Sequence, residues 1–575
     1  MPHGLLAAIV GSRFAFADSS PTFMPTTANL LAQLEETRLN FGPSWSERKI
    51  ALLRQLGRAR LNTAAQILRL HEHVCFVRAH PDDANVLREA EKVLARFAHR
   101  DDLVRHRQRL ADSGTAGTDI HYPFFWPTAR WLTARWPTRL SIDWDQVGDT
   151  QLLAASLPRL VNHLEANWLR IRKPPTRDAL ARLDGKKATD ATFLIRMVEA
   201  MPGDDFTREA FYESLALPLV LRAQADTPSR THAHYAPQRV YFSADPPSRG
   251  RPDLQAELDR PPRSVRRVPR QEGERLINLA REAMVTRGRD LDTFAYGDPG
   301  DVRLVDDGGG LTWAMIGLIP ERRPTLRTAY GYLTLRNGVP IGYAQSDTLW
   351  RCVDLAFNTF DTFRGGDSAT IVARTMAMMR HVFDGSSFTL EPYQLGEGNE
   401  EGISSGAWWF YYKLGFRPRN PKIRTLVRAE LARMKNNPRH RSSPATMARL
   451  ATDYLYFELP GVRAPYWPHL AALGSEVARL RSKGPAAPGT ATGDDKFSRA
   501  EIQLPRRVSA AARAAWVAWA PIVELIPGLD QWNDDEKRGL VRIIVAKAGR
   551  RDSDYLTLFE RHAKFGAALR QMTRA

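Results

Sequence analysis

The chain has 575 residues, and its 82 lysine and arginine residues exceed its 64 aspartate and glutamate residues by 18. Such a length exceeds one compact core and indicates about two to four domains. The net charge of +18 favours an anionic partner such as nucleic acid, a membrane surface or an acidic metabolite, but an arginine-rich protein can reach it without one.

Cysteine content and the N-terminal segment bear on the compartment. Cys75 and Cys352 are the two cysteines of the sequence, too few for a disulfide framework or a cysteine-based zinc site. Residues 5–10 are apolar, but no basic residue precedes them and Arg13 follows closely, which is not typical of a signal peptide. No stretch is apolar over the length of a membrane helix. We therefore expect a cytoplasmic protein with no membrane partner.

Residues 1–243 predict a mainly helical N-terminal region. A capping box at residues 44–47 and the pair Asp82-Asp83 each precede an amphipathic pattern. The helical patterns lie at residues 50–56, 87–97, 152–171 and 207–223.

Four tryptophans lie within this region, at positions 126, 131, 136 and 144, and arginines alternate with them. Such a segment can form a surface for single-stranded nucleic acid. It can also pack a loop between helices, with the arginines in solvent. We favour packing, because aromatic rings most often contribute to a core.

Two segments have the composition of linkers. Residues 244–270 are rich in proline and arginine, and we expect an extended linker there, although contact with phosphate is an alternative. Residues 482–501 have few apolar side chains and predict a disordered linker. Residues 436–481 predict a helical extension, and residues 502–575 predict a small C-terminal helical domain.

No metal site is expected from the histidines. His71 and His73 are two positions apart in a predicted helix, so their side chains do not share a face. His232 and His234 could chelate from an extended segment, but no third ligand accompanies them.

Residues 271–435 alone change from helical to strand-like periodicity. A helix at residues 272–285 precedes a strand at 313–319. Asn337-Gly338 then separates two strand patterns, which is typical of a tight hairpin. Further strands are predicted at residues 352–358 and 387–391, with a helix between them. We therefore expect an α+β fold, with a mixed sheet flanked by helical regions.

The loop before that helix reads Arg364-Gly365-Gly366-Asp367-Ser368-Ala369. A glycine-containing turn between a strand and a helix can bind phosphate. The first amides of the helix lack internal partners, and glycine lets the backbone approach an oxyanion. An arginine adds a charged donor.

A second motif follows, in which Asn399 precedes a short helix and the ending Tyr411-Tyr412-Lys413-Leu414-Gly415-Phe416-Arg417-Pro418. Together with the loop at residues 364–369, this ending resembles the GNAT superfamily of acyltransferases, over roughly residues 271–435. The resemblance implies an acyl-CoA-dependent N-acyltransferase, with acetyl-CoA as the default donor and a small-molecule or protein amine as the acceptor.

The resemblance also implies roles for individual residues. Arg364, Gly365, Gly366, Asp367, Ser368 and Ala369 would hold the coenzyme A pyrophosphate, and Phe357 on the strand at 352–358 would lie along the pantetheine arm. Asp367 replaces the usual glycine, so we expect its carboxylate to point away from the ligand and cap the helix. Asn399 would contact the cofactor. Tyr411 would be the general acid. The chemistry also needs a base, for which Glu391 and Glu400 are candidates, although each can instead be a solvated or capping carboxylate.

Two other hypotheses stay open. A GNAT-like transferase can use aminoacyl-tRNA as its donor, which the net charge of +18 would suit. A degenerate core can also serve as a non-catalytic ligand-binding or interaction scaffold, which the aspartate at position 367 would suit.

Overall fold

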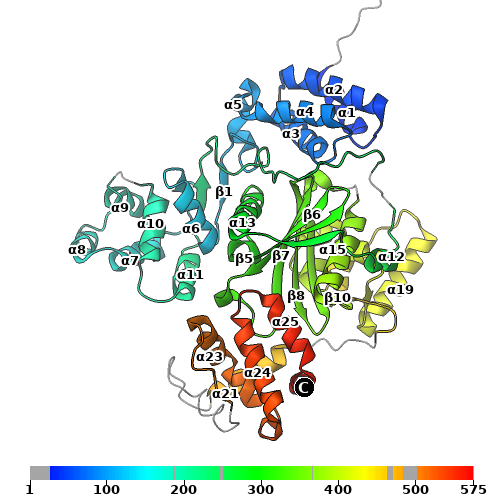
Figure 1. Cartoon of the computed structure of the whole chain (residues 1–575). Coiled ribbons are helices and arrows are strands. Elements are labelled where there is room, and N and C mark those ends of the chain that lie inside the picture. Colours follow the sequence, from blue (N-terminus) through cyan, green and yellow to red (C-terminus); the bar gives the residue numbers. More distant parts are fainter. Residues whose placement is uncertain are drawn as a thin grey trace, which may run out of the picture.

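The computed structural model describes residues 26–185, 188–246, 250–364, 367–462, 470–482 and 502–573. In this part of the chain, helical units surround one large mixed sheet, so the α+β class is confirmed (Figure 1). None of the described helices combines the length and apolar character needed to span a membrane. Residues 5–13, Gly365, Gly366 and the predicted linker at 483–501 lie outside the described residues.

The N-terminal region contains two separate hydrophobic cores. The first is built by α1 (Thr27–Thr37), α2 (Pro43–Arg58), α3 (Ala64–Ala79), α4 (Ala84–Ala95) and α5 (Asp101–His106). Asp83 caps α4, as predicted. The predicted capping box at residues 44–47 is wrong, because α2 already begins at Pro43, whose missing N–H suits the first helical position.

The second core belongs to short helices and a three-stranded sheet of order β1–β3–β2. Its elements are β1 (Ile120–Tyr122), α6 (Trp126–Arg135), β2 (Leu140–Ile142), α7 (Gln151–Leu160), α8 (His163–Arg172), α9 (Thr176–Leu183), α10 (Asp190–Glu199), α11 (Asp205–Ser214) and β3 (Leu219–Leu221). Trp126 and Trp136 are only 0% and 6% exposed, so the packing interpretation of the tryptophan-rich segment is confirmed for both.

The central sheet has nine strands in the order β11–β12–β10–β9–β8–β7–β6–β5–β4 within the described residues. They are β4 (Ser264–Arg267), β5 (Gly297–Gly308), β6 (Leu311–Leu318), β7 (Thr328–Arg336), β8 (Val339–Leu349), β9 (Cys352–Thr359), β10 (Ser387–Leu390), β11 (Arg417–Pro418) and β12 (Leu455–Glu458). Neighbours are antiparallel except β9 and β10, which are parallel.

The predicted hairpin between β7 and β8 is confirmed. Asn337 and Gly338 have positive φ values of 47° and 78°, as a tight turn of this kind requires. A Cβ on Gly338 would lie 1.8 Å from the carbonyl oxygen of Tyr235, so the turn also needs glycine for space.

The expectation of an extended linker at residues 244–270 is wrong for its second half. That half contains α12 (Leu254–Asp259) and β4, which pairs antiparallel with β5 as the last strand of the sheet. Arg267 remains exposed on this edge strand. Charged side chains suit such a position, because they oppose pairing with further strands.

Helices cover both faces of the sheet. α13 (Arg270–Val285) packs on β5. α14 (Asp292–Ala295) packs on β7, where Phe294 lies so close to Gly331 that a Cβ on this glycine would touch its ring. α15 (Ser368–Phe383) lies on the opposite face, where the rings of Phe383 and Tyr330 are 5.3 Å apart. Adjacent residues of a strand point to opposite faces, so Tyr330 faces the layer of α15 and Gly331 faces the layer of α14.

The C-terminal helices extend the core of the sheet. They are α21 (Leu470–Ser482), α23 (Ala510–Leu525), α24 (Asp534–Lys547), α25 (Asp552–Arg561) and α26 (Ala563–Met572). The hydroxyl of Tyr330 donates to Asp301 at 2.7 Å and accepts from the amide of Ser553 at 3.0 Å. This buried network joins β5 and β7 to α25.

A buried guanidinium fixes α15. Arg374 is 1% exposed, and its Nη2 lies 2.6 Å from Oδ1 of Asp307, at the end of β5. Its Nη1 donates to the carbonyl oxygens of Glu257 in α12 and of Arg260. One side chain thus connects α15 to β5 and α12.

Arg374→Met should lower the free energy of unfolding of the sheet unit by about 3–5 kcal/mol, because the buried Asp307 would keep only the more distant and half-exposed Arg260, at 3.7 Å, as a cation. The double variant Arg374→Met/Asp307→Leu should recover much of this loss, since no buried charge remains. Urea unfolding followed by tryptophan fluorescence measures both. A double variant no more stable than the single one would contradict this role.

Candidate functional site

The parallel strands β9 and β10 separate shortly after they pair. Cys352, Val353 and Asp354 lie opposite residues 387–389, whereas β9 continues to Thr359 and β10 ends at Leu390. From residue 355 onward, no strand of the described residues lies beside β9 on that edge. Its backbone groups there are available to side chains or to a ligand.

A pocket of about 620 Å³ lies at this opening, within the size range of small-molecule sites. It is bordered by β9, the start of α15, and the helices α16 (Pro392–Leu395), α17 (Glu400–Ser405) and α18 (Ala407–Leu414). The predicted site residues that line it are Phe357, Arg364, Ser368, Ala369, Asn399 and Tyr411. Asp367 and Glu391 are outside the lining, and Gly365 and Gly366 are not described.

The N-terminus of α15 faces this pocket through Ser368 and Ala369. Asp367 occupies the N-cap position, but its side chain makes no capping hydrogen bond, so the predicted cap is wrong. Its carboxylate instead pairs with Arg336 of β7, because that guanidinium is a stronger partner than a backbone amide. The first amides and the positive dipole end of α15 thus remain without a carboxylate from the cap.

Two arginines at the pocket share one carboxylate. Arg364 Nη2 lies 2.5 Å from Glu401 Oε1, and Arg289 Nη2 lies 2.6 Å from Glu401 Oε2. Burial raises the pKa of Glu401, but the hydrogen bonds from both arginines outweigh it and lower that pKa. With Arg251 and Lys413, the described part of the lining holds four basic side chains and one acidic one, a net charge of +3.

Tyr411 belongs to α18 and is 3% exposed, with its ring packed against Phe410 and Phe416. Burial raises the pKa of its hydroxyl, which keeps the group protonated at neutral pH. Asn399 caps α17: its Oδ1 accepts from the amide of Gly402 at 3.1 Å, and its Nδ2 donates to the carbonyl oxygen of Tyr393 at 3.0 Å. The structure therefore gives Asn399 a role in shaping the pocket wall.

Gln394 was not predicted from the sequence. Its Oε1 accepts from the backbone amide of Phe357 at 3.2 Å, on the open edge of β9. Arg289 and Glu401 were likewise not predicted, because each becomes part of the pocket only when distant segments meet. Their spacing in the sequence carries no pattern that points to a shared site.

Glu391 lies in a row of acidic side chains on the face opposite α15. Asp347, Asp354 and Thr389 are direct neighbours across β8, β9 and β10, and the Thr389 hydroxyl donates to Asp354 at 3.0 Å. Burial and the nearby Glu391 raise the pKa of Asp354 to about 7. Burial also raises the pKa values of Asp347 and Glu391. Glu391 is thus separate from the pocket lining, although α16 begins at the next residue.

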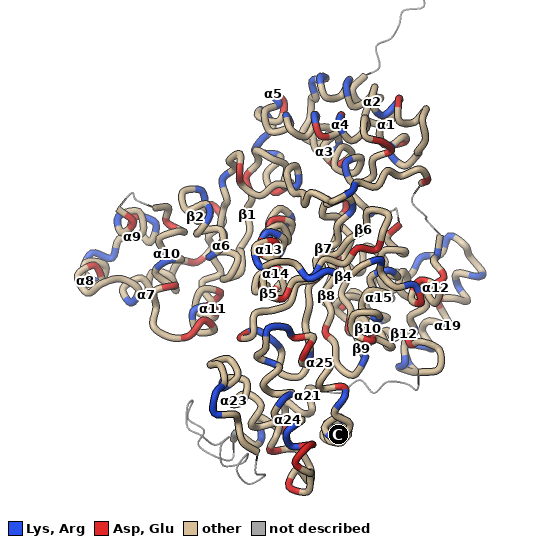
Figure 2. The backbone as a smooth tube through the Cα atoms, in the orientation of Figure 1, with Lys and Arg blue, Asp and Glu red and all other residues tan. Residues whose placement is uncertain are grey.

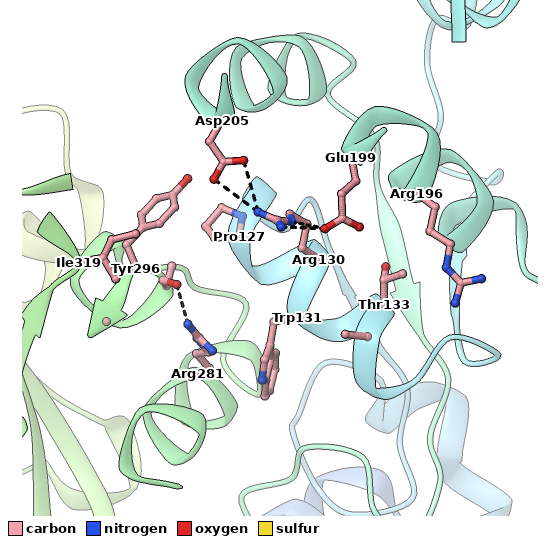
Figure 3. Close-up of a pocket in the computed structure, with 13 residues that line it drawn as sticks. Pro127, Arg130, Trp131, Thr133, Arg196, Glu199, Asp205, Arg281, Tyr296 and Ile319 are labelled. Atoms are coloured by element: carbon pink, nitrogen blue, oxygen red, sulfur yellow. Dashed lines mark hydrogen bonds and ion pairs between the residues drawn. The ribbon is translucent and has the colours of Figure 1, made fainter. Parts of the chain in front are cut away.

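A second cavity, of about 470 Å³, lies between the N-terminal region and the sheet (Figure 3). Arg130 of α6 points between Glu199 and Asp205, with 2.7 Å to Glu199 and 3.5 Å to Asp205. Arg281 of α13 donates to the carbonyl oxygens of Phe294 and Ala295. Arg130 and Arg281 are thus engaged by protein groups, and none of the residues expected to bind the cofactor or to act in catalysis lines this cavity, so we interpret it as a polar gap between two units.

Comparisons of the chain with protein-family models, with curated proteins and with solved structures find no match. The chemistry of the pocket is therefore inferred from its own residues. Among the described residues, no group of three or more histidine, cysteine, aspartate or glutamate side chains could hold a metal ion.

Asp354→Asn should change how stability depends on pH. The native carboxyl keeps its proton up to about pH 7, whereas the unfolded one, with its pKa at the model-compound value of 3.8, loses it earlier. The native state then binds more protons between these values, so the free energy of unfolding of the wild type should fall as pH rises through this window. The Asp354→Asn variant should lack this contribution to the pH dependence of the free energy of unfolding.

Calorimetry at pH 5 and pH 8 on both proteins measures the difference. Asp535→Asn serves as the control, because its side chain is 87% exposed. A pH dependence of Asp354→Asn that parallels the wild type would show that this carboxyl is not protonated in the native state.

Proposed function

We propose that the sheet unit is a GNAT-like N-acyltransferase that binds an acyl-CoA thioester, with acetyl-CoA as the default donor, and transfers the acyl group to an amine. The observation that carries this proposal is the opening between β9 and β10 beside the start of α15. It combines an unpaired strand edge, a helix N-terminus and a hydroxyl in one pocket. A long thioester with a charged end needs these three features.

The pyrophosphate of the donor would bind at the start of α15. The amides of Ser368 and Ala369 lie at the positive end of the helix dipole, and the carboxylate of Asp367 pairs with Arg336. Arg364 supplies a charged donor once an anion competes with Glu401 for it. The net charge of +3 around the pocket favours such an anion.

The pantetheine arm would lie along the open edge of β9. The amide groups of the arm can pair with backbone groups of β9 after Asp354. The amide of Phe357 is one available donor, because it already donates to the side chain of Gln394. Phe357 and Phe410 supply apolar walls for the arm. The thioester would then lie toward Tyr411, at the α18 side of the same pocket.

The reaction needs an acid and a base. In the proposed reaction the amine attacks the thioester carbonyl carbon, and a backbone amide on the β9 edge can stabilise the oxyanion. The C–S bond would then break, and Tyr411 would give its proton to the leaving thiolate. The amine proton must pass to a base. Glu391, the candidate from the sequence, has a raised pKa that suits a proton acceptor at neutral pH, but it lies outside the pocket lining, so it would act through a bridging water.

Binding of acetyl-CoA should raise the melting temperature of the full chain, since a ligand of the native state stabilises it. Arg364→Gln should weaken this binding by about 10- to 100-fold, because it removes a charged hydrogen-bond donor. Glu401→Gln should strengthen it, because Arg289 and Arg364 lose the carboxylate that they share and, among the described residues, Arg364 keeps only the exposed Asp361 as a carboxylate partner. Calorimetric titration with acetyl-CoA measures the affinities.

Arg351→Gln is the matched control, because this exposed arginine pairs with Asp384 away from the pocket. No thermal shift with millimolar acetyl-CoA would reject the proposal. Equal effects of Arg364→Gln and Arg351→Gln would place the pyrophosphate elsewhere.

Tyr411→Phe should lower turnover by about 100-fold or more while leaving the affinity for acetyl-CoA unchanged, as expected on loss of a general acid. Within the described residues its hydroxyl has no hydrogen-bond partner, so the variant should be as stable as the wild type. Release of free thiol from acetyl-CoA, with a panel of amines, measures turnover. Tyr412→Phe is the control, and wild-type turnover in Tyr411→Phe would remove Tyr411 as the acid.

A further inference from the structure

Nearly half of the net charge of the chain comes from one short segment. Residues 417–441 contain nine lysine or arginine residues and one acidic residue, Glu430, which gives +8 of the total +18. The segment forms β11, α19 (Pro421–Asn436) and the loop that leads to α20 (Pro444–Leu450). Figure 2 shows basic residues along α19 at the outer side of the sheet unit.

These charges are directed into solvent. All nine basic side chains are exposed, whereas Glu430 is buried and is used by Arg433, His440 and Ser442. Among the described residues, carboxylates lie within ion-pair distance of only two of the nine, Arg419 and Arg433. The other seven concentrate positive charge on one surface, which is unfavourable unless an anion neutralises it.

Part of this surface is a groove of about 320 Å³ between α18, β11 and α19. It is lined by Tyr412, Arg417, Pro418, Arg424, Val427, Arg428 and Leu431, with no acidic side chain. Arg417 is held in place by the carbonyl oxygens of Tyr412 and Phe416, at 2.7 and 2.8 Å. Arg424 and Arg428 lie one turn apart on α19, where like charges repel each other.

We infer that the surface formed by residues 417–441, called here the α19 surface, binds the phosphodiester backbone of a nucleic acid. Arginine matches phosphate geometry with paired donors, and the charge continues beyond the groove along α19 to Arg439 and Arg441. An acidic protein surface fits less well, because Leu431 is the one large exposed apolar side chain of the groove.

The contacts available are to the backbone and not to the bases. Tyr412 is the aromatic residue of the groove, and its ring is stacked on Trp408 at 5.3 Å and covered by Arg417 at 4.2 Å. Neither face of the ring is open for a base to stack on. Binding should therefore depend strongly on salt and weakly on sequence.

This site does not depend on acyltransferase activity, although Tyr412 directly follows Tyr411 in α18. A nucleic acid on the α19 surface would lie against the helix whose other side borders the pocket. The two proposals can fail separately, because one is measured with acetyl-CoA and the other with nucleic acid alone.

The test compares wild type with the triple variant Arg417→Gln/Arg424→Gln/Arg428→Gln, using fluorescence anisotropy of labelled nucleic acid. Probes of mixed sequence as single-stranded RNA, duplex RNA and duplex DNA distinguish the source of the backbone. The triple variant should bind about tenfold or more weakly at low salt, and the slope of log affinity against log salt should fall by about 2–3.

The control variant is Arg58→Gln/Arg107→Gln/Arg109→Gln, which removes the same charge from exposed positions of the N-terminal helices. It should bind within about twofold of wild type if the α19 surface is the site. Equal losses in both variants would reduce the effect to net charge and overturn the proposal. No binding at low salt, or binding of polyglutamate but of none of the nucleic acids, would overturn it as well.

Discussion

The position of α15 is the constraint on which the rest of the sheet unit depends. This helix connects the parallel strands β9 and β10, and the buried Arg374 holds it against Asp307 of β5 and the carbonyl oxygens of Glu257 and Arg260. A buried guanidinium with several partners tolerates little displacement, because each lost partner leaves a charge or a carbonyl group unsatisfied. The helix N-terminus is thereby fixed at the opening between the strands.

The pocket follows from that placement. β10 turns into α16 after four residues, and β9 continues alone, so a strand edge and a helix N-terminus meet at one cavity. The carboxylate of Asp367, which stands where the GNAT pattern has glycine, pairs with Arg336 and is not part of the pocket lining. The positive charge of the lining and the buried hydroxyl of Tyr411 then give the cavity the polarity of an anion site with a proton donor.

Local patterns predicted the hairpin at Asn337-Gly338, the strands β9 and β10 and the helix between them, because each is dictated by neighbouring residues. They failed for β4, whose arginine-rich strand is stabilised by pairing with β5 and not by its own propensity. The excess of basic residues at positions 417–441 was visible in the sequence, but whether they can bind an anion depends on whether their side chains are exposed. Only the folded chain shows all nine cations in solvent and Glu430 buried.

By itself, the sequence determined the class of fold, the strand–loop–helix unit at residues 352–383 and six of the residues that line the pocket. The tertiary structure alone decided that Arg289 and Glu401 meet Arg364, that Gln394 occupies the edge of β9 and that Glu391 stands outside the lining. The physical reason is sequence separation. Contacts between residues 37 to 112 positions apart depend on how helices pack on the sheet, and no local periodicity encodes that packing.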